Sequence, residues 1–279
     1  MLNSMNVHKI GAETNFKSGT TFKILKTVNT LNVKKIEQDL LSRGVKADFK
    51  DNKSICADFV FAFDILEKLS EKLKLPFFYK PPVIQVYDEK EILFADDKQN
   101  LGIHIREKDF YLKQKRAFKE GTILINKDFN KTHISNDFHS SLRGWEKLFS
   151  TGHFLHVTLH ELMHNIELNQ IYKKYGYRGL DKDLRKKYHK QFTPDLGKVM
   201  EETYNLMSLT KNEKLFLKNN VSFYALCTRK WTEVYAELMT KLIVKSLDKN
   251  LNPVKNPLDF LPKDCPKRFK DLLNKTLEI

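Results

Sequence analysis

The chain has 279 residues, of which 41% are hydrophobic and 30% charged, and its formal net charge is +14. This composition allows one substantial core or two lobes that share a cleft, and no apolar run approaches the roughly eighteen residues that cross a membrane. The positive charge would attract acidic partners, but basic residues alternate with acidic ones and no nucleic-acid-binding signature is present, which argues against a nucleic-acid partner.

The N-terminus and the cysteines indicate the cellular compartment in which the protein is expected. Residues 1–31 are polar and lack regular periodicity, so we expect a flexible lead without a classical secretory signal. The three cysteines are widely separated and odd in number, which argues against a disulfide framework and favours a reducing compartment. We therefore expect a cytoplasmic protein, or one exported without a classical signal peptide. Cys227 is interpreted as a small buried residue in preference to a metal ligand.

Residues 32–150 are predicted to form an N-terminal lobe of helices followed by a small sheet. Asn32 is a candidate N-cap for a helix that Gly44 ends, and a second helix runs from about Ser54 to just before Pro76. Short apolar runs between charged turns predict the strands, which are Val83–Tyr87, Ile92–Ala95, Leu101–Ile105 and Gly121–Asn126. The last of these, at 122–126, is either an edge strand that binds an extended peptide or an interior strand, and the sequence leaves both open.

Residues 151–279 are predicted to form a mainly helical lobe, which makes the chain an α+β protein. From His153 to Gln170 no proline or glycine interrupts the sequence, and leucine or isoleucine recurs every three to four residues, as in an amphipathic helix. A lysine-rich stretch follows and contains the dense basic run Arg185–Lys190, a candidate edge of a substrate groove. A proline-punctuated loop precedes the last predicted helix, Lys267–Leu277.

The segment His160-Glu161-Leu162-Met163-His164 lies within the predicted helix 153–170. Residues four apart face the same side of a helix, so both imidazoles can bind one metal ion. Glu161 would lie beside that ion, where its carboxylate can take a proton from a bound water. This is the helical signature of zinc peptidases, although ordinary surface or core histidines would give the same spacing.

A catalytic zinc needs a third protein ligand and one open position. The metzincin pattern is excluded, because residue 170 is Gln and residue 167 is Glu. The best candidate is the predicted helix around 231–239, where Glu233 and Glu237 share a face among apolar neighbours. We assign Glu233 to the zinc and Glu237 to the ring of a ligand histidine, against the alternative that both carboxylates are solvated.

His160-Glu161-x-x-His164 followed by Glu233-x-x-Ala236-Glu237 resembles the gluzincin clan of zinc metallopeptidases. The segment 221–225, with Tyr224 nine positions before Glu233, is similar to the Ser-x-Tyr segment of the anthrax lethal factor-like branch. The resemblance covers roughly residues 120–245 and implies a zincin-like fold, with a small mixed sheet beside the active-site helix. It also implies that the Tyr224 hydroxyl lies over the metal and stabilises the oxyanion.

Two features depart from the clan. Glu233 follows His164 by 69 positions, which is longer than usual and requires an insertion, and Tyr224 lies slightly farther from the glutamate than in the lethal factor-like pattern. The expected function is hydrolysis of a protein or peptide substrate by a zinc-activated water, with Glu161 as general base. The alternatives are an inactive zincin-like binding protein and a hydrolase of non-peptide amides. No feature indicates an oligomeric state.

Overall fold

The computed structural model describes residues 30–73, 81–88, 102–105, 118, 121–127, 149–175, 206 and 208–277. Three sequence predictions lie outside these residues: the lead up to residue 29, the strand Ile92–Ala95 and the basic run Arg185–Lys190. The lobe boundaries near residues 31 and 150 stay predictions.

Two helices open the described chain as the sequence predicts. Helix α3 (Val33–Ser42) is capped by Asn32, whose side chain accepts a hydrogen bond from the Lys35 N–H at 3.1 Å. Gly44 follows it with a φ of +83°, a conformation that glycine adopts without the steric cost of a Cβ atom. Helix α4 (Lys53–Leu73) follows a short turn, and its apolar face belongs to the main core.

The sheet has four strands in the order β1 (Lys46–Asp48), β2 (Val83–Tyr87), β4 (Ile123–Asn126) and β3 (Gly102–His104). β1, β2 and β4 are parallel, and β3 pairs with β4 in the antiparallel direction, so the sheet is mixed as expected. β4 is paired on both sides and is therefore an interior strand. Of the two readings that the sequence left open for residues 122–126, the edge strand is the wrong one, and among the described strands β3 forms this edge.

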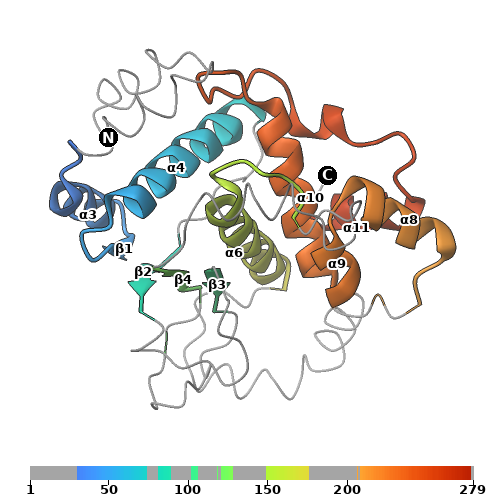
Figure 1. Ribbon diagram of the computed structural model, residues 1–279, viewed down its shortest axis with the longest axis horizontal. Coiled ribbons are helices and arrows are strands. Elements are labelled where there is room, and N and C mark those ends of the chain that lie inside the picture. Colours follow the sequence, from blue (N-terminus) through green and yellow to red (C-terminus); the bar gives the residue numbers. More distant parts are fainter. Residues whose placement is uncertain are drawn as a thin grey trace.

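Helix α6 (His156–Tyr175) lies at the centre of the molecule, between the sheet and α4 on one side and α10 (Trp231–Ser246) on the other (Figure 1). Its near neighbour in the sheet is β3, the edge strand. Residues 155 to 167 of this segment are all buried, and about half of them are polar or charged. A helix whose polar residues are buried must give each of them a partner, because an unsatisfied buried polar group costs about 1–3 kcal/mol.

The C-terminal region is helical, as predicted, and contains α8 (Lys211–Asn220), α9 (Phe223–Thr228), α10, the short 3-10 helix η1 (Pro257–Phe260) and α11 (Lys267–Leu277). α8 begins with a capping box between Thr210 and Glu213. Its apolar residues join those of α3, α4, α6 and α10 in one hydrophobic cluster that extends from Val33 to Leu277. The described chain thus shares a single main core.

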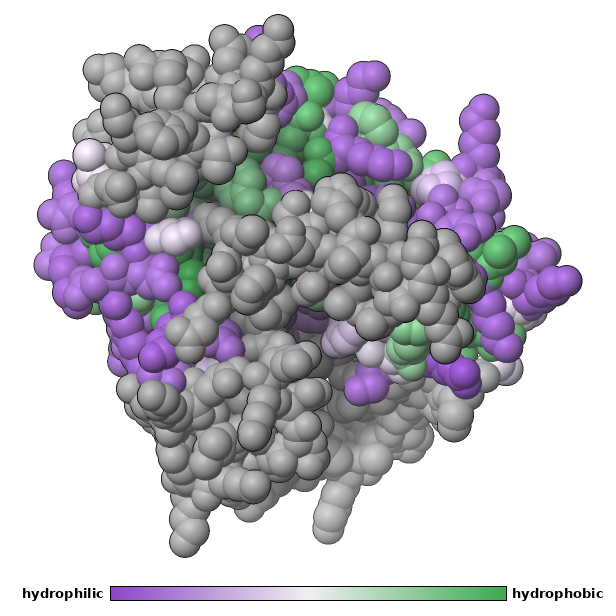
Figure 2. All heavy atoms as spheres, in the orientation of Figure 1, coloured by the Kyte–Doolittle hydropathy of each residue, from purple (hydrophilic) through white to green (hydrophobic). Residues whose placement is uncertain are grey.

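Polar and charged residues dominate the described surface on the face shown in Figure 2. Within the described residues, no helix combines the length and apolar character needed for a membrane span.

Candidate metal centre

One face of α6 carries His156, His160 and His164, because a spacing of four residues returns to the same side of a helix. All three imidazoles are buried, and they face α10, which brings Glu233 and Glu237 to the same place. Glu237 is fully buried, whereas the Glu233 side chain retains 18% of its exposure. The structure therefore excludes the alternative in which both carboxylates are merely solvated.

Three donor atoms of this cluster lie at the corners of a small triangle. Nε2 of His160 is 3.0 Å from Nε2 of His164, and Oε2 of Glu233 is 3.3 Å from each of these nitrogens. A tetrahedral ion with bonds of about 2.0–2.1 Å separates its ligand atoms by about 3.3–3.4 Å. The spacing of the three atoms therefore fits one zinc-sized ion, with the fourth position free of protein ligands from this group.

The charges around the triangle also favour a cation at this place. Burial disfavours the imidazolium, but the carboxylates of Glu233 and Glu237 outweigh burial and raise the pKa of His160 well above its usual value. Burial likewise disfavours the carboxylate of Glu233, yet His164 and His160 outweigh it and lower the pKa of Glu233. A metal ion at the triangle would compete with protons for the imidazole nitrogens, because both bind the same lone pairs.

Behind the triangle, Glu237 holds the ring of His160 from its other side. Oε1 of Glu237 lies 3.3 Å from Nδ1 of His160 and 3.3 Å from Nε2 of His156, while its Oε2 accepts a hydrogen bond from the Ser150 N–H at 2.7 Å. A carboxylate at Nδ1 favours the tautomer in which Nε2 carries the lone pair, which is the form that binds a metal. The sequence analysis assigned Glu237 to the ring of a ligand histidine, and Nδ1 of His160 is the ring atom that lies beside it.

Glu161 is buried and lies against the edge strand β3. A Cβ atom built on Gly102 would lie 2.8 Å from Oε1 of Glu161 and 3.0 Å from the Val157 side chain. The backbone of β3 therefore approaches the carboxylate so closely that an added Cβ atom would displace the Glu161 side chain. This contact places the candidate base between the helix and the strand edge.

Two further rings flank the two imidazoles of the triangle. The Tyr224 ring, on α9, has its centroid 6.3 Å from that of His160, and the His104 ring, on β3, has its centroid 6.2 Å from that of His164. Tyr224 is 37% exposed. The structure thus brings Tyr224 to the cluster, on the side of His160.

Two other residues fall outside the cluster. Glu167 is buried on α6, but it belongs to neither of the metal-competent groups found among the described residues. Cys227 is also absent from these groups and is exposed, so its interpretation as a buried residue is wrong. It lies near the end of the short helix α9, a helix that the sequence analysis did not predict.

No family model matches the chain, and neither a curated protein nor a solved structure matches it. The buried cluster of His156, His160, His164, Glu233 and Glu237 is consistent with a metal site of the HExxH type. The suggestion of a metal enzyme therefore depends on the buried His and Glu groups, since no comparison adds to it.

Sequence reasoning missed His156, Gly102 and His104. A signal for His156 was available, because it precedes His160 by four residues and so shares its helix face. Gly102 and His104 reach the cluster through the pairing of β3 beside α6, which no local pattern in the sequence reveals.

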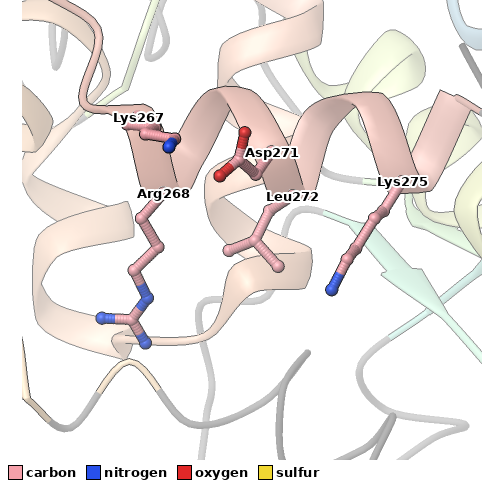
Figure 3. Close-up of a pocket in the computed structure, with 5 residues that line it drawn as sticks. All are labelled: Lys267, Arg268, Asp271, Leu272 and Lys275. Atoms are coloured by element: carbon pink, nitrogen blue, oxygen red, sulfur yellow. The ribbon is translucent and has the colours of Figure 1, made fainter.

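A pocket of about 430 Å³ lies on α11, away from these groups, and is lined by Lys267, Arg268, Asp271, Leu272 and Lys275 (Figure 3). Arg268, Leu272 and Lys275 extend from the same side of the helix. The pocket contains no metal-competent group among the described residues. We therefore place the candidate site at the His/Glu cluster.

Proposed function

We propose that this chain is a zinc-dependent metallopeptidase of the gluzincin clan, nearest to the lethal factor-like branch. The observation that carries the proposal is the triangle of His160 Nε2, His164 Nε2 and Glu233 Oε2, with edges of 3.0–3.3 Å. The mixed sheet with an antiparallel edge strand beside the helix of the motif also supports it.

In this proposal His160, His164 and Glu233 hold the zinc, and Glu237 orients His160. A bound zinc would lower the pKa of its water towards about 7, and it would also polarise the carbonyl of the scissile bond. The donor set of two imidazoles and one carboxylate is the one that leaves a fourth position for this water. A purely structural zinc site is usually closed by a fourth protein ligand, which the described triangle lacks.

Glu161 is the proton carrier in this scheme. Its carboxylate takes the proton from the attacking water and delivers it to the leaving amine, which prevents expulsion of an unstable amide anion. Burial of Glu161 between α6 and β3 limits its rotamers, so that it starts near the geometry that proton transfer needs.

The substrate would bind to the outer edge of β3, on the side where no described strand lies. An extended peptide can pair with a strand edge through main-chain hydrogen bonds, which places successive carbonyls along the edge. Gly102 and His104 of this strand lie against Glu161 and near His164 respectively. A peptide on β3 would therefore present a scissile carbonyl to the triangle and to the base together.

Gly102→Ala should lower kcat for peptide cleavage by about 100-fold while zinc affinity stays near that of the wild type. The new methyl group would collide with Oε1 of Glu161 and displace the carboxylate, and a shift of about 1 Å can cost about 10²-fold in rate. Steady-state kinetics and zinc titration test this. The matched control is Gly44→Ala at the turn after α3, where no described atom beyond the adjacent residues lies within 4 Å of the added Cβ and only stability should fall. Equal kcat in Gly102→Ala and the wild type would contradict the placement of Glu161.

Tyr224→Phe should lower kcat by about 10²–10³-fold, with little change in zinc affinity. The hydroxyl would donate a hydrogen bond to the oxyanion, and the loss of one such donor has this effect in other hydrolases. The ring is already close to that of His160, with centroids 6.3 Å apart. Kinetics on a peptide substrate measure the effect, and an unchanged kcat would remove Tyr224 from the mechanism.

The function itself is tested with a proteome-derived peptide library and zinc-loaded protein, with the cut sites identified by mass spectrometry. We expect cuts that disappear on chelation, return with zinc and depend on the residues on both sides of the bond. Bound zinc without any cut would favour a binding protein, and hydrolysis of small amides alone would favour a non-peptide hydrolase.

A further inference from the structure

His156 lies one helical turn before His160 and outside the motif, and it is 2% exposed. Its Nε2 is 3.3 Å from Oε1 of Glu237, the same oxygen that lies 3.3 Å from Nδ1 of His160. Its ring packs against Phe149 at 5.0 Å and against His160 at 5.8 Å between centroids. One buried carboxylate oxygen is therefore shared by two imidazoles of the same helix.

The environment of Glu237 explains why this second imidazole matters. The residue is fully buried, and a buried carboxylate is costly unless hydrogen-bond donors surround it. The Ser150 N–H donates a hydrogen bond to Oε2, at 2.7 Å, and not to Oε1. Oε1 faces the two imidazoles, so His156 is the donor that can hold this oxygen in place independently of His160.

We propose that His156 is a positioning residue for the metal centre: it holds Oε1 of Glu237 against Nδ1 of His160, and thereby keeps Nε2 of His160 directed at the metal. The inference rests on the proposed metal centre and adds to it the residue that contacts Glu237. His156 touches neither the substrate nor the metal in this role. It acts only through Glu237.

The same three groups, His156, His160 and Glu237, have the spacing of a second metal site. Two contacts argue against that use. A second ion would have to share His160 with the first, and Glu237 already accepts the Ser150 N–H through Oε2. Nε2 of His156 and Nδ1 of His160 each lie 3.3 Å from Oε1 of Glu237, so this oxygen already has two imidazole neighbours.

The test compares His156→Leu, which removes the donor, with His156→Gln, which can replace it through an amide N–H. Zinc affinity is measured by competition with a chelator, and the cobalt(II)-loaded proteins are compared by visible absorption, which reports ligand geometry. Thr158→Val is the control, because it removes a buried polar group two residues further along α6, on the opposite side of the helix.

We expect His156→Leu to bind zinc about 10–100-fold more weakly and to change the cobalt spectrum, as is usual when an outer-shell partner is lost. His156→Gln should recover most of the affinity, and Thr158→Val should keep it. In the Glu237→Gln background His156→Leu should add little, because both changes interrupt the same contact.

Wild-type affinity and spectrum in His156→Leu would overturn the inference and leave the metal centre intact. Binding of two metal ions by the wild type, with one lost in His156→Leu, would overturn it by making His156 a ligand. Failure of the wild type to bind zinc would instead refute the proposed function on which the inference rests.

Discussion

Glu161→Ala is expected to lose about 10²–10⁴-fold in kcat/KM for peptide cleavage while it retains one zinc per chain. General base catalysis contributes a factor of this size, and Glu161 is not among the three atoms of the triangle. Glu161 is buried, and its Oε1 is the atom nearest to a Cβ placed on Gly102, so the carboxylate lies against β3. Activity is measured on a peptide taken from the library, and zinc by elemental analysis of the purified protein.

Glu161→Gln is the companion variant, because it keeps the volume beside Gly102 and removes only the ability to accept a proton. It should be as inactive as Glu161→Ala. Loss of zinc from either variant would show that Glu161 has been given the wrong role. Retention of full activity in Glu161→Gln would exclude Glu161 as the base.

Glu233→Ala is expected to lower zinc affinity by more than about 100-fold, which exceeds the usual effect of losing an outer-shell partner. The variant keeps His160 and His164 but removes the carboxylate oxygen that lies 3.3 Å from both nitrogens. Two imidazoles without the carboxylate give an incomplete ligand set for catalytic zinc. Chelator competition measures the affinity directly.

Glu167→Ala is the matched control for that experiment. Glu167 is a buried glutamate three residues after His164, yet it lies outside the metal-competent groups of the described residues. Its replacement can lower stability but should preserve zinc binding. The reverse outcome, with zinc lost from Glu167→Ala and kept by Glu233→Ala, would show that the third ligand has been chosen wrongly.

Much of the fold follows from local patterns in the sequence. Asn32 precedes the first turn of α3 and Gly44 follows its end, as predicted. The last helix, Lys267–Leu277, has the predicted limits. Strong helical periodicity and cap residues act within one or two turns, so they can be recognised without knowledge of the rest of the chain. β1, with three residues, is too short for any periodic signal, and it was missed.

The order of strands could not be predicted in the same way. Whether residues 122–126 lie at an edge depends on where β3 pairs, and that pairing joins segments about twenty residues apart. The all-buried pattern of β4 is what an interior strand shows, but a short apolar run has this composition in either position. That β3 and not β4 forms this edge among the described strands is known only from the topology.

Some residues of the candidate site could be predicted from local sequence, and others could not. His160, Glu161 and His164 are neighbours on one helix, so the motif alone placed them together. Glu233 was inferred from two glutamates in an apolar helix, since buried carboxylates need partners. The close approach of Gly102 and the ring of His104 arise from packing between α6 and β3, which local sequence does not encode.

In the proposed metal centre, His160, His164 and Glu233 bind one zinc ion and leave one position open. X-ray absorption at the zinc edge of the zinc-loaded protein, together with zinc stoichiometry, measures these ligands and their number. We predict one zinc per chain, surrounded by nitrogen and oxygen atoms at about 2.0–2.2 Å, with imidazole scattering that falls in His160→Ala and in His164→Ala. Absence of bound zinc, a sulfur atom bound to the zinc, or a spectrum that these variants leave unchanged would show that these three residues do not bind it.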